Sequence, residues 1–187
     1  MSLEKEKIIA NAKKYFDTAK KLDFTNQEFT DFLGQNFIAA PASTMESLHN
    51  AFEGGLIDHL LRVASYAVKF NNALPESEQV NQNSLLKVCL LHQVGKANLY
   101  KPCTSEWHRK NQGKMYEFNE DLVSMRVSER SVYYALSHGI KFTEEESTIK
   151  PTDNTISFNS MGDFVFAYSE EEFIFYTSKD GFALGLC

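Results

Sequence analysis

Residues 55–74, GLIDHLLRVASYAVKFNNAL, constrain the fold more than any other part of the chain. Their apolar side chains recur every three or four positions, which predicts an amphipathic helix with one buried face. A second segment, residues 83–94 (NSLLKVCLLHQV), is more uniformly apolar, so we expect a central helix there. The buried stripe of the first helix comprises Leu56, His59, Leu60, Val63, Ala67, Phe70 and Leu74. Together the two segments predict a mainly α-helical fold.

The remaining segments complete a single domain whose tail differs from its body. Helical spacing also occurs in residues 4–22, 26–38, 128–138 and 143–149, and Thr143 with Glu146 predicts a capping box at the start of the last of these. Residues 105–118 predict a mixed helix or loop. In the tail, aromatic or branched residues alternate with polar ones, which predicts a short β-hairpin or an irregular β element. We therefore expect one domain in three parts: N-terminal helices (1–44), a helical core (45–149) and a β-containing tail (150–187).

Charge and composition exclude several classes of protein. The chain has 187 residues and a net charge of −6, and no run of Lys or Arg exceeds two, which argues against nucleic-acid binding by a basic face. No apolar run approaches the ~20 residues of a membrane span. The N-terminus is too charged for a signal peptide. The three cysteines are widely spaced and favour a reducing compartment, so we expect a cytoplasmic protein.

Two histidines on the main helices are the first candidates for chemistry. His59 lies within the apolar stripe of residues 55–74, and His92 lies near the end of the central helix. If these helices pack side by side, both imidazoles point into one cleft. Imidazoles and carboxylates together can hold a divalent metal, which polarises a phosphoryl oxygen and lowers the pKa of bound water. The alternative is that each histidine is a hydrogen-bonded core residue. Lys96 follows His92 by one turn and could hold a phosphate oxygen.

Two motifs carry a resemblance to a known family. The stretches HNAFEGGLIDHLLRV and LLHQVGK, in this order, resemble the HD-domain superfamily of metal-dependent phosphohydrolases. The sequence that follows, which begins TSEWHRKNQGKMYEF, is similar to HD-domain proteins of tailed phages. The resemblance covers roughly residues 45–146. It implies an HD-domain-like helical bundle, a phosphomonoester or phosphodiester substrate of nucleotide type and a divalent ion such as Mn, Fe, Ni, Co or Mg. For a phage-encoded chain the compartment would be the host cytoplasm.

The resemblance also implies roles for individual residues. His59 matches the first metal ligand of the family, and His92 matches the histidine of the His-Asp pair. Asp180, in TSKDGFA, matches the last ligand. His108 resembles an extra histidine that some members use for a second metal or for phosphate. Arg109 and Lys96 would hold substrate phosphate beside the metal.

The chain departs from the family pattern at three positions. Gln93 stands where the family has the aspartate of the His-Asp pair, and Thr152 and Thr177 stand where relatives carry histidines. Glutamine offers a neutral carbonyl, which neither bridges two metals nor accepts a proton. Loss of one unit charge at close range costs several kcal/mol of attraction at an effective dielectric of ~20. The metal-binding set therefore resembles an eroded active site.

Two interpretations of function follow from these departures. In the first, the protein is a divergent but active phosphohydrolase, in which another carboxylate, such as Asp58, Asp153 or Asp163, replaces the one lost at Gln93. In the second, the HD fold is kept without catalysis, and the protein binds a nucleotide, a nucleic-acid end or a protein partner.

Other polar features each have a functional and a structural interpretation. The cationic patch from Trp107 to Lys110 could hold substrate phosphates or form a solvated helix face. Arg62 could reach the cleft or form a surface salt bridge. His49 could contact phosphate, support a ligand or cap a helix. The pair Gly54-Gly55 predicts a tight turn into the following helix.

The aromatic residues of the tail also allow two interpretations. They could form a small sheet packed on the helical core, or they could form the contact surface of a homo-oligomer, because aromatic residues are enriched in interface cores. These residues are Phe158, Phe164, Phe166, Tyr168, Phe173, Phe175, Tyr176 and Phe182.

Overall fold

A computed structural model describes residues 5–143, 146, 155–157, 164–168, 173–177 and 183–186. Its helices are α1 (Lys5–Lys21), α2 (Gln27–Ala39), α3 (Gly55–Ala73), α4 (Gln82–Leu91), α5 (Glu106–Gln112) and α6 (Val127–Ser137), with single 3₁₀ turns η1 (Glu76–Glu78) and η2 (Val94–Lys96). Its strands are β1 (Tyr100–Pro102), β2 (Tyr116–Phe118), β3 (Thr155–Ser157), β4 (Phe164–Tyr168), β5 (Phe173–Thr177) and β6 (Ala183–Leu186). The expected fold class, mainly α with a β element in the C-terminal part, is confirmed.

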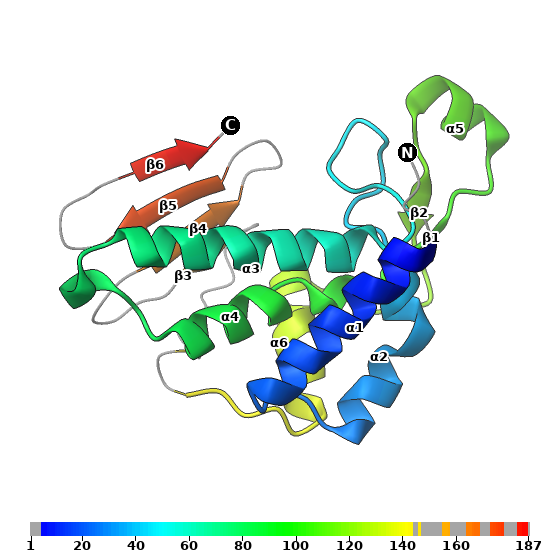
Figure 1. The fold of residues 1–187 in the computed structure, drawn as a ribbon. Coiled ribbons are helices and arrows are strands. Elements are labelled where there is room, and N and C mark those ends of the chain that lie inside the picture. Colours follow the sequence, from blue (N-terminus) through cyan, green and yellow to red (C-terminus); the bar gives the residue numbers. More distant parts are fainter. Residues whose placement is uncertain are drawn as a thin grey trace.

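The strands form two antiparallel sheets. In the C-terminal part, β3 to β6 pair in sequence order, with Phe166 opposite Ile156 on one side and Phe175 on the other. The tail thus forms a four-stranded sheet, which is larger than a single hairpin. The second sheet is the β1–β2 hairpin, which carries α5 at one end of the molecule (Figure 1). The sequence did not predict these strands, because three residues are too few to show a period of two.

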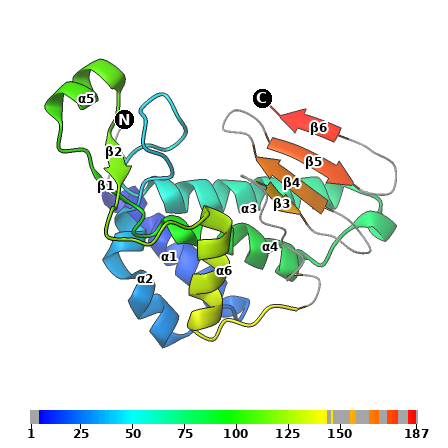
Figure 2. The same ribbon diagram turned by 180° about the vertical axis from the view of Figure 1, so that it is seen from behind.

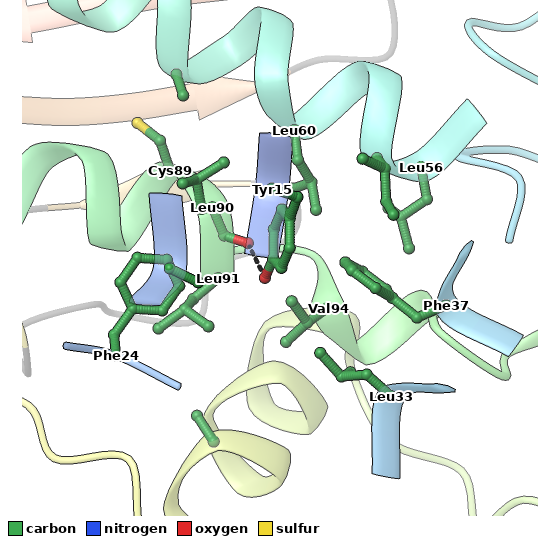
Figure 3. Packing of buried hydrophobic residues seen from close by; sticks show 14 of the residues in the cluster. Tyr15, Phe24, Leu33, Phe37, Leu56, Leu60, Cys89, Leu90, Leu91 and Val94 are labelled. Carbon is green, nitrogen blue, oxygen red and sulfur yellow. Dashed lines mark hydrogen bonds between the residues drawn. The ribbon is translucent and has the colours of Figure 1, made fainter. Parts of the chain in front are cut away.

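The two main helices pack against each other as expected. Helix α4 lies between α3 and α6, and α1 crosses beside them (Figure 2). Leu56 and Leu60 of α3 and Leu90 of α4 are almost fully buried. Figure 3 shows how aromatic rings from α1 and α2 fill the space around these side chains. The central position of α4 explains why residues 83–94 are apolar on most sides.

One buried hydrogen bond ties α1 to the central helix. The hydroxyl of Tyr15 donates to the backbone carbonyl of Leu90 at 3.0 Å, and Tyr15 is only 1% exposed. Burial raises the pKa of this phenol far above its usual range, so the hydroxyl stays protonated and remains a donor.

Removal of this hydroxyl is expected to destabilise the protein. We expect Tyr15→Phe to lower the free energy of unfolding by about 1–2 kcal/mol, because a buried carbonyl loses its donor. Urea unfolding measures the change. Tyr66→Phe is the matched control, since Tyr66 is 52% exposed, and it should change stability by less than about 0.5 kcal/mol. Equal effects of the two substitutions would contradict the structural role of the Tyr15 hydroxyl.

Local signals at helix ends are also found as predicted. Gly54 has a φ of 77° just before α3, and a Cβ on Gly55 would lie 2.1 Å from the carbonyl oxygen of Asn50. The glycine pair therefore makes a tight turn, as expected. Thr143 and Glu146 form a reciprocal capping box: the Thr143 amide donates to the Glu146 carboxylate at 2.9 Å, and the Glu146 amide donates to the Thr143 hydroxyl at 3.2 Å.

Two features bear on the class of protein. No helix in the described ranges is long and apolar enough to cross a membrane. Cys89 and Cys103 are buried and free of disulfide bonds. Whether the aromatic side chains of the tail pack on the helical core or form an oligomer contact stays open between the two interpretations, because the side chains of residues 147–187 lie outside the description.

Candidate functional site

Three histidines come together at the start of α3 and the end of α4. His59 lies on α3 and is 2% exposed, His92 follows the last residue of α4, and His49 lies in the loop before α3. The ring of His59 lies 4.8 Å from the ring of His49 and 5.7 Å from the ring of His92, between centroids. The structure thus brings His59 and His92 together, as their positions on the two helices suggested. We call His49, His59 and His92 the histidine cluster.

Burial and neighbouring cations keep the histidine cluster neutral at physiological pH. Burial lowers the pKa of His49 to about 4, with further contributions from the positive charges of Lys96 and Arg62. Burial likewise lowers the pKa of His92 to about 4. The pKa of His59 lies well below its usual value, first through burial and then through its histidine neighbours and the same two cations. The three imidazoles are neutral, and the ammonium of Lys96 places positive charge near them; Arg62 adds less, because it is more exposed and pairs with Asp58 at 3.5 Å.

A backbone contact fixes the tautomer of His92. Its Nδ1 atom lies 2.7 Å from the carbonyl oxygen of Cys89, and a carbonyl can only accept a hydrogen bond. Nδ1 therefore carries the proton, and Nε2 keeps its lone pair. This orientation suits an imidazole that accepts a hydrogen bond or binds a cation through Nε2.

Lys96 lies beside the cluster in turn η2. It is 9% exposed, and its ammonium donates a hydrogen bond to the carbonyl of Ala42 at 2.6 Å. An ammonium carries three N–H donors, so this contact takes one of them. Lys96 therefore connects the turn after α4 to the segment that precedes the His49 loop, and it also supplies charge at the cluster.

Helix α6 explains the glycine of the LLHQVGK motif. A Cβ on Gly95 would lie 2.6 Å from the carbonyl oxygen of Val127, so only glycine fits against α6 there. The Gly95 amide donates to the hydroxyl of Ser131 at 2.9 Å, and that hydroxyl also lies 3.0 Å from the carbonyl of His92. Ser131 thus orients the turn between His92 and Lys96. No pattern in the sequence pointed to Ser131, which is 36 residues from its glycine partner.

Gln93 is buried in the same turn. It is 6% exposed, and its side-chain oxygen has no hydrogen-bond partner within the described part of the chain. A buried amide oxygen without a donor is costly, since burial removes its water without replacing the hydrogen bond. Its neutral amide supplies no charge beside His92.

The carboxylate of Asp58, which precedes His59 in the sequence, contacts other residues than the histidine cluster. Asp58 accepts a hydrogen bond from the side chain of Asn50 at 3.0 Å. It also lies 3.5 Å from the Arg62 guanidinium and 3.6 Å from the Lys7 ammonium. Asp58 therefore supports the loop before α3, and Arg62 forms the salt bridge that was one of its two interpretations. The remaining acidic candidates, Asp153, Asp163 and Asp180, lie outside the described residues, as does Thr152.

The candidates on α5 belong to a more exposed part of the protein. Trp107 is 60% exposed, Arg109 is exposed, and Lys110 forms an i,i+4 ion pair with Glu106 at 2.6 Å. This description matches the solvated helix face. His108 is partly buried, and its ring packs edge-on against Trp107 at 5.3 Å between centroids. Phosphate contacts by His108 and Arg109 stay a prediction.

The described side chains do not by themselves fit a divalent metal. Among the residues that the structure describes, no group of three or more His, Cys, Asp or Glu side chains is arranged to hold one. The histidine cluster brings imidazole nitrogens together, but the neighbouring charges that act on it are positive. Ions such as Mg and Mn prefer carboxylate oxygens, which balance their charge.

Comparisons with known proteins leave the family open. No family model, no curated protein and no solved structure matches this chain. The resemblance to HD-domain phosphohydrolases therefore rests on the two motifs and on the residues that they contain.

Proposed function

We propose that this protein is an HD-type phosphohydrolase relative that binds a phosphate-containing ligand of nucleotide type at the histidine cluster, with reduced hydrolytic activity. One observation carries the proposal: three neutral imidazoles lie together beside the buried, positively charged side chain of Lys96. A buried, positively biased region attracts an anion more strongly than an exposed one, because water screens it less.

Anion binding at this cluster would be coupled to proton uptake. A bound phosphate places negative charge beside imidazoles whose pKa lies near 4, and this charge raises their pKa. Protonated imidazoles in turn donate more hydrogen bonds to phosphate. We therefore expect the ligand to bind more tightly at pH 6 than at pH 8.

Reduced hydrolysis follows from the position of Gln93. Family members are expected to activate water with a metal that their aspartate helps to hold, and the metal lowers the pKa of that water. Gln93 supplies a neutral amide instead. The remaining base, Nε2 of His92, has a pKa near 4 and is a weak proton acceptor.

Calorimetric titration with inorganic phosphate and with a nucleoside monophosphate tests the proposal. We expect Lys96→Gln to weaken binding about tenfold or more, because an amide can still donate to Ala42 but carries no charge. Lys69→Gln is the matched control: Lys69 is an exposed lysine of α3, and its substitution should leave binding unchanged. No binding of either compound at millimolar concentration would overturn the proposal.

Metal content and turnover decide between binding and catalysis. The purified protein would be assayed for Mn, Fe, Ni, Co and Mg, and then tested on nucleotides and on a generic phosphodiester with each ion added. Trace amounts of bound metal and slow turnover would support the reduced hydrolytic activity that we propose. Stoichiometric metal together with turnover typical of hydrolases would contradict this proposal and show that the protein is an active phosphohydrolase.

A further inference from the structure

The side chain of Asn50 connects the loop before α3 to the first two turns of that helix. Its amide nitrogen donates to the carbonyl of Gly55 and to the carboxylate of Asp58, both at 3.0 Å. Its amide oxygen accepts a hydrogen bond from Arg62 at 2.9 Å. Asn50 also has a φ of 51°, in the left-handed region that asparagine tolerates better than most residues. One side chain thus fixes the end of the loop that carries His49.

Backbone carbonyls of Asn50 and His49 are held by the preceding segment of the chain. The carbonyl of Asn50 accepts a hydrogen bond from the Ala42 amide at 3.0 Å, and the carbonyl of His49 accepts one from the Ser43 hydroxyl at 2.6 Å. Lys96 donates to the carbonyl of Ala42. The position of His49 is therefore coupled to both α3 and the turn after α4.

Asp58 is the charged part of this arrangement. Its side chain is 14% exposed and lies among Asn50, Asn11, Lys7 and Arg62. Successive residues of a helix point about 100° apart, so Asp58 and its neighbour His59 face different sides. Asp58 thus contacts the loop residue Asn50, while His59 contacts the other histidines of the cluster.

We infer that Asn50 and Asp58 form a clamp that positions His49 against His59, and that His49 is the third imidazole of the binding site. The role of the clamp in ligand binding rests on the proposed function, whereas its effect on His49 does not. Asn50 and Asp58 are positioning residues, since they act through His49.

Two spectroscopic signals report the clamp without any ligand. Nuclear Overhauser contacts between the imidazole protons of His49 and His59 report the ring pair, whose centroids lie 4.8 Å apart. Hydrogen exchange of the Ala42 amide reports its bond to the Asn50 carbonyl. We expect Asn50→Gly, which keeps the left-handed backbone but removes the side chain, to abolish the ring contacts and to speed Ala42 exchange about tenfold.

A pair of substitutions at Asp58 supplies the second test. Asp58→Asn keeps an oxygen that can accept from Asn50, and should retain most of the ring contacts; Asp58→Ala should lose them. Asp17→Ala is the control, because Asp17 forms an exposed ion pair with Lys13 on α1, and it should change nothing at the cluster. The Asp58 pair decides the inference if Asn50→Gly does not fold.

Phosphate titration of the same variants separates this inference from the proposed function. Asp58→Ala and Asp58→Asn remove the same negative charge, so the difference between them reports the clamp; we expect Asp58→Ala to bind phosphate about tenfold more weakly than Asp58→Asn. Loss of the ring contacts in a protein that binds no phosphate would support the clamp and refute the function. Folded Asp58→Ala and Asn50→Gly proteins that keep the ring contacts would overturn the clamp.

Discussion

Acidification from pH 7 to pH 4 is expected to destabilise this protein by several kcal/mol. In the unfolded chain the three histidines of the cluster protonate near pH 6.5. In the folded protein, burial lowers the pKa of His49 and His92 to about 4 and that of His59 well below its usual value. As the pH falls, the unfolded state therefore binds protons at a higher pH than the folded state does. The contribution of the neutral histidines to the free energy of unfolding is fully present above pH 6.5 and is lost as the pH falls towards 4.

The size of this effect follows from the number of protons involved. Each histidine that is charged only in the unfolded state contributes about 1.4 kcal/mol per pH unit, which is reduced in practice for the partly exposed His49. Urea unfolding between pH 7 and pH 5 isolates the histidines, because most carboxylates protonate at lower pH. His59→Gln should flatten the slope, since it removes one titrating group. A free energy of unfolding that stays constant from pH 7 to pH 5 would contradict the neutral cluster.

Restoring a carboxylate at position 93 is expected to create metal affinity. Gln93 is buried in the turn that follows His92, and a charge at this depth attracts a dication far more strongly than an amide does. We expect Gln93→Asp to bind Mn, Fe or Co at least about 100-fold more tightly than the natural protein. Calorimetry with each ion and elemental analysis of the purified variant measure the gain.

The matched control separates charge from size. Gln93→Asn has the same length as the aspartate variant but no charge, so it should gain no metal affinity. Equal metal binding by the two variants would mean that charge at this position does not govern the site. Turnover of a phosphodiester by Gln93→Asp alone would support the HD-type scaffold, even with the natural protein inactive.

The helices were largely predictable, because their signals are local. The stripe through residues 55–74 and the apolar segment 83–94 became α3 and α4, and the periodicity that defines a buried face also placed His59 on it. The capping box of Thr143 and Glu146 needed only a spacing of three residues. The β1–β2 hairpin was missed, since its strands are too short for a pattern.

The candidate site was predictable only in part. His59 and His92 were expected to meet, and they do. His49 had three interpretations in the sequence, and its place beside His59 depends on hydrogen bonds from Ser43 and Ala42 to the loop that carries it. Asp58 was a candidate to replace the carboxylate lost at position 93, but its side chain contacts Asn50, Arg62 and Lys7 instead.

The sequence by itself determined the helical fold, the buried faces of α3 and α4, and the neutral amide at Gln93. These properties depend on residue type and on spacings within one helix. Tertiary structure decided that His49 joins the histidine cluster, that Asp58 supports a loop, and that Ser131 of α6 fixes the turn at Gly95. Such contacts join residues far apart in the chain, and their geometry exists only after the helices have packed.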